Sequence, residues 1–186
     1  MIKCAITGNI ASGKSTVENI IKERFPVYDT DIIAHEILDS FKNFNGYDVF
    51  TNGKIDRTKL GKLVFENNKI KKELENIVHP LVKKEIINIF DKHKNDKIVF
   101  ISVPLLFETG FESLFDKVLF VSADKLTRLK RLMKRNNLSE EEAMLRINAQ
   151  YPEEEKIKNS DFMIENNSDL ESLKTQIYNF YKLLKI

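Results

Sequence analysis

The sequence predicts an α/β fold with a parallel sheet, and three observations support this prediction. Short apolar runs alternate with longer helical patterns along the 186 residues, which is the order of elements in parallel sheets. The runs at residues 98–101 and 118–121 are continuously apolar, as strands buried on both faces are. A glycine-containing turn at residues 8–15 joins the first apolar run to the first helical pattern. We therefore expect one α/β domain over residues 1–186, with helices on both faces of its sheet.

The individual elements follow in order from these patterns. Strand-like apolar runs occupy residues 2–7, 25–28, 98–103, 118–121 and 162–164. Helical patterns occupy residues 14–24, 31–41, 69–93, 124–136, 139–149 and 168–184. The interval between the second and third strands is too long for one crossover, so we expect residues 32–96 to form a mostly helical insertion. Within it, His79-Pro80 is expected to break the helical pattern of residues 69–93, because proline interrupts helices.

Composition excludes several classes of protein. The formal net charge is only +2, which gives no electrostatic case for a nucleic-acid or membrane partner. Cys4 is the one cysteine and lies within the first strand run, so we expect a small buried side chain and no internal disulfide. No apolar run approaches the roughly 18 residues that span a bilayer. The first strand run begins at residue 2 and leaves no room for a signal peptide, so we expect a cytosolic location.

The segment GNIASGKS, residues 8–15, carries the most specific chemistry in the chain. It fits the phosphate-binding pattern G-x-x-x-x-G-K-[ST] and stands between a predicted strand and a predicted helix, as that pattern requires. Its backbone N–H groups and the helix N-terminus would face an anion. Lys14 can reach the β- and γ-phosphates, and the Ser15 hydroxyl can bind Mg²⁺. A plain glycine–serine turn is the alternative, and it leaves the four matching residues unexplained. The segment therefore predicts a nucleoside triphosphate site.

Two carboxylates follow the second predicted strand. If the extended backbone continues beyond the strand, Asp29 and Asp31 point to the same side, toward the carboxyl end of the sheet. Phosphoryl transfer to a hydroxyl needs a carboxylate that accepts or orients the hydroxyl proton, and Asp31 could be that base. Alternatively, Asp31 only caps a helix that begins at Ile32, a role that aspartate favours. The local sequence supports both readings equally.

Arginine is rare in the chain and clustered. Only six arginines stand against 24 lysines, and four of the six fall within residues 128–146. Arg128, Arg131 and Arg135 lie at i, i+3 and i+7, which is one face of a helix. Because arginine recognises phosphate with a planar fork, the cluster favours a basic lid helix that contacts ATP. The alternative is an exposed helix whose arginines pair with the glutamates at 140–142.

Other residues give weaker indications. Leu105, Leu106 and Phe107 follow the third strand run and could line an apolar pocket or simply pack in the core. No aspartate of the Walker B kind ends that run, and Asp124 is better explained as a helix cap. His79 is isolated and has no metal-ligand spacing to another histidine, so a structural role suits it as well as a catalytic one.

The whole order of motifs resembles the dephospho-coenzyme A kinase family over nearly the full length. The matching positions are Thr7 to Gly8, Ser12 to Thr16, Asp29, Asp31, His35, 53–57, Leu60, 64–65, 74–75, Ile77, 79–80, 103–108, Arg128, Leu129, Arg131, Arg146, Ile147, Gln150, Asp161, Ile164 and Asn166. Asn9 and Ala11 stand where this family usually has glycine.

This resemblance implies a P-loop NTPase kinase core with a helical substrate-binding insertion and an arginine-bearing lid at residues 124–149. It implies transfer of a phosphoryl group from ATP, with Mg²⁺, to the ribose 3′-hydroxyl of dephospho-coenzyme A. Residues expected to hold the nucleotide are Gly8, Ala11, Ser12, Gly13, Lys14, Ser15, Thr16, Arg128 and Arg146, with Ser15 on the metal. The catalytic residues would be Lys14, Asp31, Arg131 and Arg135. Residues expected to contact the acceptor are Thr7, Asp31, Arg57, His79 and Leu105.

Two other functions compete with this one. Another small P-loop kinase, acting on a nucleoside or a shikimate-like alcohol, shares the donor motif. A regulatory GTPase would also have a P-loop, but its guanine-binding tetrapeptide Asn-Lys-x-Asp does not occur here. The sequence indicates no obligatory protein partner.

Overall fold

The structure is a computed structural model that describes residues 1–186. Its strands are β1 (Ile2–Gly8), β2 (Val27–Asp29), β3 (Phe50–Thr51), β4 (Lys54–Ile55), β5 (Ile98–Ser102), β6 (Lys117–Ser122) and β7 (Phe162–Glu165). Its α-helices are α1 (Lys14–Lys22), α2 (Thr30–Asp39), α3 (Arg57–Glu66), α4 (Asn68–Lys92), α5 (Leu106–Thr109), α6 (Lys125–Asn136), α7 (Glu140–Asn148), α8 (Glu153–Lys158) and α9 (Leu170–Leu184). A short 3₁₀ helix spans Glu112–Leu114. None of the helices combines the length and the apolar character that crossing a bilayer requires.

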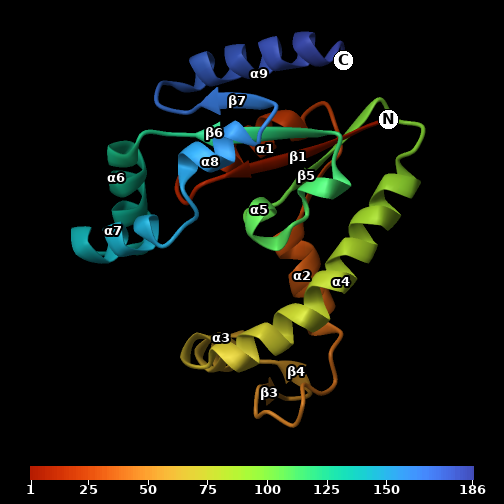
Figure 1. The fold of residues 1–186 in the computed structure, drawn as a ribbon, viewed down its shortest axis with the longest axis vertical. Helices are drawn as coiled ribbons and strands as arrows, with labels where there is room; N and C mark the ends of the chain where they lie inside the picture. The colour runs from red at the N-terminus through yellow and green to blue at the C-terminus, as the bar shows by residue number, and fades with distance from the viewer. The chain divides into compact units, whose positions relative to one another are not determined.

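A five-stranded sheet forms the centre of the larger part of the chain (Figure 1). Its strand order is β2-β5-β1-β6-β7, so β1 lies in the middle. β1 is parallel to both neighbours, with Ile6 beside Ser102 of β5 and Gly8 beside Val121 of β6. β7 is parallel to β6. The predicted α/β class with a parallel sheet is confirmed, and all five predicted strands occur. The carboxyl end of the central strand leads directly into the glycine-containing turn.

Alternating side chains of the sheet build its core. Cys4 and Ile6 of β1 are completely buried in a cluster that includes Ile21 of α1 and Phe180 of α9. Phe180 stacks edge-on against Phe162 of β7, with 5.0 Å between ring centroids, and Figure 1 shows α9 running alongside that strand. Burial raises the pKa of the Cys4 thiol, so the thiol stays protonated and behaves as a small apolar side chain. The expectation of a buried cysteine is confirmed, and its lack of reactivity stays a prediction.

The chain divides into two compact units. One comprises Met1–Tyr28 with His93–Ile186, and the other comprises Asp29–Lys92. The second unit contains α2, the β3–β4 hairpin, α3 and α4, and its own apolar cluster is centred on the completely buried Phe44. It is mostly helical and follows β2. A role of this unit in binding a substrate stays a prediction.

Two features of the second unit differ from expectation. Helix α4 runs unbroken from Asn68 to Lys92 with Pro80 inside it, so the predicted break at His79-Pro80 is wrong. Proline removes one backbone donor, but Val78 and Val82 are buried on either side of it and the apolar face continues. The β3–β4 hairpin was not expected. Its signal is Asn52-Gly53, the dipeptide of a tight hairpin turn, and both residues have positive φ.

Candidate functional site

The turn between β1 and α1 has the geometry of an anion site. Helix α1 begins at Lys14, and its N-cap, Gly13, has φ 89° and supplies no capping side chain. The first N–H groups of α1 therefore lack a side-chain acceptor, and the positive end of the helix dipole lies at the turn. Ser15 and Thr16 are exposed in this first turn of the helix. Ala11 also has a positive φ, of 62°, where the resemblance implies glycine.

Side chains from the far end of the chain hold this turn in place. The Asn166 amide Nδ2 donates to the carbonyl oxygen of Ser12 at 2.8 Å, and Arg131 Nη1 donates to the same oxygen at 3.3 Å. Arg131 Nη2 also donates to the carbonyl oxygen of Asn166 at 2.8 Å. On the other side, the backbone N–H of Ile10 donates to Gln150 Oε1 at 2.7 Å. These hydrogen bonds hold the backbone of the turn from two sides.

Lys14 is paired within its own helix. Its Nζ lies 2.6 Å from Glu18 Oε1 and also donates to the hydroxyl of Ser102. Ser102 Oγ in turn donates to Glu18 Oε1 at 2.6 Å. Glu18 and Ser102 are both buried, at 9% and 0% exposure. The lysine expected to reach the phosphates thus has a carboxylate partner that sequence reasoning did not identify.

Arg128 is buried, which contradicts the alternative of an exposed arginine face on α6. Its Nη2 lies 2.8 Å from Glu153 Oε2, and only 5% of the residue is exposed. Glu153 also accepts from Ser122 Oγ at 2.6 Å and from Asn9 Nδ2 at 3.4 Å. The partner of Arg128 is therefore Glu153 of α8 and not a glutamate at 140–142. The Nε and Nη1 atoms of Arg128 are buried without a hydrogen-bond partner.

The other two clustered arginines of α6 lie in different environments. Arg131 contacts the turn as described, whereas Arg135 is exposed and donates from Nε to Asn136 Oδ1 at 3.0 Å. Arg128, Arg131 and Arg135 were expected to share one role on one helix face, but each has different surroundings in the structure. Asp124 caps α6 by accepting from the backbone N–H of Thr127 at 2.8 Å, which confirms its predicted capping role.

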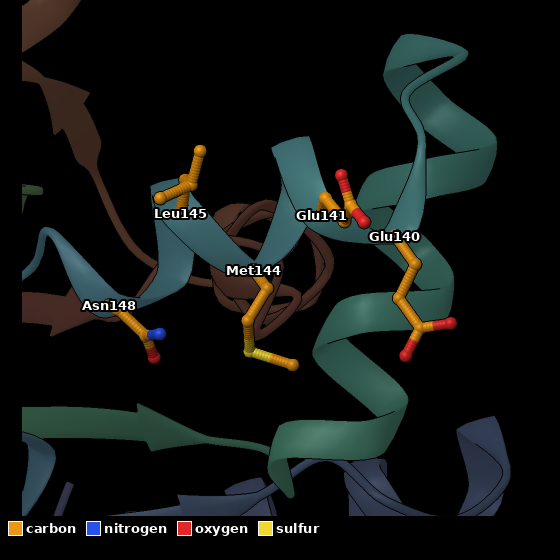
Figure 2. A pocket seen from close by; sticks show the side chains of 5 residues that line it. All are labelled: Glu140, Glu141, Met144, Leu145 and Asn148. Atoms are coloured by element: carbon orange, nitrogen blue, oxygen red, sulfur yellow. The ribbon is translucent and has the colours of Figure 1, made fainter.

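The region at residues 124–149, predicted to form a lid, also includes α7, which Figure 2 shows from close by. Ser139 and Glu142 form a reciprocal capping box at its start, and Ala143 and Ile147 pack against α6. A pocket of about 660 Å³ lies on this helix, lined by Glu140, Glu141, Met144, Leu145 and Asn148. None of these is a predicted site residue, and the two carboxylates would repel phosphate. Arg146 of α7 is exposed and does not line this pocket.

The aspartates after β2 are arranged differently from the expectation. Helix α2 begins at Thr30, so the extended backbone ends at Asp29 and the two carboxylates are not on one side of a strand. Asp29 is the N-cap, and its carboxylate accepts from the backbone N–H of Asp31 at 2.8 Å. Asp31 lies in the first turn and is exposed. The capping role proposed for Asp31 is therefore wrong, and Asp29 fills it.

The remaining predicted site residues vary in exposure. In the second unit, Arg57 Nη2 lies 2.8 Å from Asp39 Oδ2 on the surface, and His79 is partly buried. In the first unit, Leu105 is half exposed at the start of α5. Thr7 is completely buried, and its Oγ1 has no hydrogen-bond partner. Gly8 lies against β6, where an added Cβ would come within 2.5 Å of the carbonyl oxygen of Val121.

A central parallel strand, a glycine turn and an uncapped helix that presents Lys14 and Ser15 are the features of a P-loop nucleotide-binding fold. A crystal structure of shikimate kinase from Bacteroides thetaiotaomicron has this fold, with a TM-score of 0.59 at 14% identity, and covers 100% of this chain and 99% of its own. The fold predicted for the core is thus confirmed.

Comparison with known sequences identifies the family. The family model described as dephospho-CoA kinase matches residues 2–172, and the chain belongs to this family. A dephospho-CoA kinase from Bacillus thuringiensis is 44% identical over 183 residues, 92% of each chain. The structure of dephospho-CoA kinase from Campylobacter jejuni matches with a TM-score of 0.77 and 33% identity, over 98% of this chain and 97% of that one. The resemblance stated from the sequence is confirmed.

Proposed function

We propose that this protein transfers the γ-phosphoryl group of ATP to the ribose 3′-hydroxyl of dephospho-coenzyme A, which completes coenzyme A. Membership of the dephospho-CoA kinase family over residues 2–172 is the observation that carries this proposal. The uncapped, preformed P-loop supplies the donor site that the reaction needs. No observation favours a shikimate-like or nucleoside acceptor, since the shikimate kinase comparison supports the fold alone.

The donor half of the reaction depends on the P-loop. The first N–H groups of α1 and the buried hydroxyl of Ser12, which has no partner in the structure, would bind phosphate oxygens. Lys14 would leave Glu18 and bind the β- and γ-phosphates. We propose that six further residues also contact the bound ATP: Gly8, Ala11, Gly13, Thr16, Arg128 and Arg146.

The residues present also fit Mg²⁺. The exposed hydroxyl of Ser15, in the first turn of α1, is the hard oxygen ligand that Mg²⁺ takes beside nucleotide phosphates. When bound, Mg²⁺ would neutralise charge on the phosphates. We propose that Arg131 and Arg135, as part of a lid, contact the phosphoryl group that is transferred.

Asp31 is the proposed acceptor of the hydroxyl proton. Its carboxylate is exposed, and the capping of α2 belongs to its neighbour Asp29. In the step, a bond forms between the ribose 3′-oxygen and the γ-phosphorus, and the bond to the β,γ-bridging oxygen breaks. ADP leaves, and the hydroxyl proton passes to Asp31. We also propose that Thr7, Arg57, His79 and Leu105 contact the acceptor. The cytosolic location stays a prediction.

An acceptor panel tests the proposal. ADP release would be measured with dephospho-coenzyme A, adenosine, shikimate or no acceptor, and the position of the new phosphate would be determined in the product. We expect transfer to the ribose 3′ position, with much weaker use of adenosine, because binding of the remote arm improves the reacting geometry. Phosphate at another position, or no transfer to dephospho-coenzyme A, would overturn the proposal.

A further inference from the structure

The strands that flank β1 end without an acidic side chain that could serve the P-loop. In P-loop enzymes, Mg²⁺ is held by the P-loop hydroxyl and by an aspartate at a strand end. Here β5 ends at Ser102 and β6 ends at Ser122. Asp124, just beyond β6, accepts both the backbone N–H and the hydroxyl of Thr127 and caps α6. Neither flanking strand therefore offers a free carboxylate to a metal beside Ser15.

Each of these serines instead donates to a glutamate that comes from a helix. Ser122 Oγ donates to Glu153, whose charge is balanced by the buried Arg128. Ser102 Oγ donates to Glu18, whose charge is balanced only by Lys14. The two glutamates differ in what ATP would do to them. Arg128 would keep its ion pair, whereas Lys14 must turn toward the phosphates.

Glu18 lies on the same helix, α1, as Ser15, the predicted metal ligand. Glu18 follows Ser15 by three residues, and residues at i and i+3 lie on the same helix face. Helical side chains lean toward the N-terminus, so a glutamate at this position leans toward the turn that holds Ser15. The hydrogen bond from Ser102, 2.6 Å long, fixes the carboxylate against the end of β5.

The charge balance around Glu18 is a second reason to expect Mg²⁺ there. Glu18 is 9% exposed, and a buried carboxylate is costly unless a cation or several donors accompany it. When Lys14 moves to the phosphates, Glu18 keeps Ser102 but loses its cation. The cation that arrives with the nucleotide is Mg²⁺, and it would restore the balance.

We propose that Glu18, held by Ser102, is the carboxylate that this chain offers to the Mg²⁺ of bound ATP, in place of an aspartate at the end of β5. The inference rests on the proposed function, because it requires that the P-loop binds Mg·ATP. The chain has no group of three or more His, Cys, Asp or Glu side chains placed to hold a metal. A site of one carboxylate and one hydroxyl, completed by phosphates, is the kind that Mg²⁺ uses.

The test measures nucleotide binding without turnover. Binding of a non-hydrolysable ATP analogue would be measured calorimetrically for wild type and Glu18→Gln, once with EDTA and once with Mg²⁺. Affinity of Mn²⁺ for the protein–analogue complex, measured by electron paramagnetic resonance, gives an independent readout. Glutamine has the same shape and can still accept from Ser102. We expect metal affinity to fall about 10- to 100-fold, as it does when groups around a metal are removed. Affinity with EDTA should be unchanged or higher, because Lys14 is released.

Two further variants complete the design. Glu23→Gln, at the exposed end of the same helix, should leave all three affinities unchanged. Adding Ser102→Asp to Glu18→Gln returns a carboxylate to the end of β5 and should recover the Mg²⁺ effect; thermal melting checks that the variants fold.

Equal changes in analogue affinity with EDTA and with Mg²⁺ would overturn the inference, because Glu18 would then act on Lys14 alone. Unchanged Mn²⁺ affinity in Glu18→Gln would overturn it as well. If the wild type bound no analogue under either condition, the proposed function would fail first, and the role of Glu18 with it.

Discussion

Replacing Gly13 by alanine tests how tightly the P-loop is held. Gly13 has φ +89°, a conformation that alanine rarely adopts. An added Cβ would lie 1.9 Å from the Asn166 amide nitrogen, so the Asn166 side chain must move. That amide is buried and donates to the carbonyl oxygen of Ser12. The substitution therefore strains the backbone and breaks the contact that holds the turn.

The structure gives the size of the effect. The left-handed conformation costs an alanine about 1–2 kcal/mol. Loss of a buried hydrogen bond that leaves its partners unsatisfied costs about 1–3 kcal/mol. Gly13→Ala should thus lower the free energy of unfolding by about 2–5 kcal/mol, which leaves a domain of ordinary stability folded. For a chain of this length, the melting temperature should fall by roughly 2–4 °C per kcal/mol.

Urea unfolding would measure the difference, with Gly61→Ala as the matched control. Gly61 lies within α3, and an added Cβ there meets no atom within 4 Å, so this change should stabilise the protein by about 0.5–1 kcal/mol. Asn166→Ala should reduce the further loss caused by Gly13→Ala, since the clash disappears. A loss below about 1 kcal/mol in Gly13→Ala alone would refute the reasoning.

Four further outcomes are expected. Lys14→Ala should nearly abolish turnover and also lower the melting temperature, because the buried Glu18 carboxylate loses its cation; retained activity would contradict the role assigned to Lys14. Asp31→Asn should lower kcat by about 10²- to 10⁴-fold while α2 keeps its Asp29 cap, and a normal kcat would refute the proposed base. Arg131→Lys should reduce both stability and turnover, because lysine cannot bond two carbonyl oxygens with a planar fork; normal values in melting and rate assays would exclude its role in holding the turn. Bonds from Thr127 lower the pKa of Asp124, so its stabilising effect is present above the usual carboxyl range and lost as pH falls through the lowered pKa. Asp124→Ala should therefore lower the melting temperature at neutral pH and lower it less in acid, and a pH-independent difference would contradict this.

Sequence patterns predicted those features that depend on neighbours in the chain. The continuously apolar strands β5 and β6, the turn at residues 8–15 and the Asp124 cap each follow from a few adjacent residues, and each is confirmed. The local pattern allowed two roles for Asp31, and the capping role is wrong. The helix starts at Thr30, two residues earlier than a cap at Asp31 requires, and this makes Asp29 the cap instead of Asp31.

The contacts that shape the site could not be predicted, because they join distant residues. Arg131 reaches the Ser12 carbonyl across 119 positions, and Asn166 reaches it across 154. Ser102 and Glu18 are separated by 84 positions, so nothing near Glu18 indicates a buried partner. Arg128 was expected on a lid helix that contacts ATP, and its ion pair could not be predicted because the partner, Glu153, lies on another helix.

The supports of the P-loop have a consequence for the order in which the chain is synthesised. The phosphate-binding turn leaves the ribosome within the first residues, but Arg131, Gln150 and Asn166, which fix its backbone, are translated last. A nascent chain that ends before residue 131 contains the complete motif and none of these supports. If the turn binds ATP as proposed, a chain truncated before residue 131 should bind it more weakly, because the hydrogen bonds from Arg131, Gln150 and Asn166 to the turn are absent.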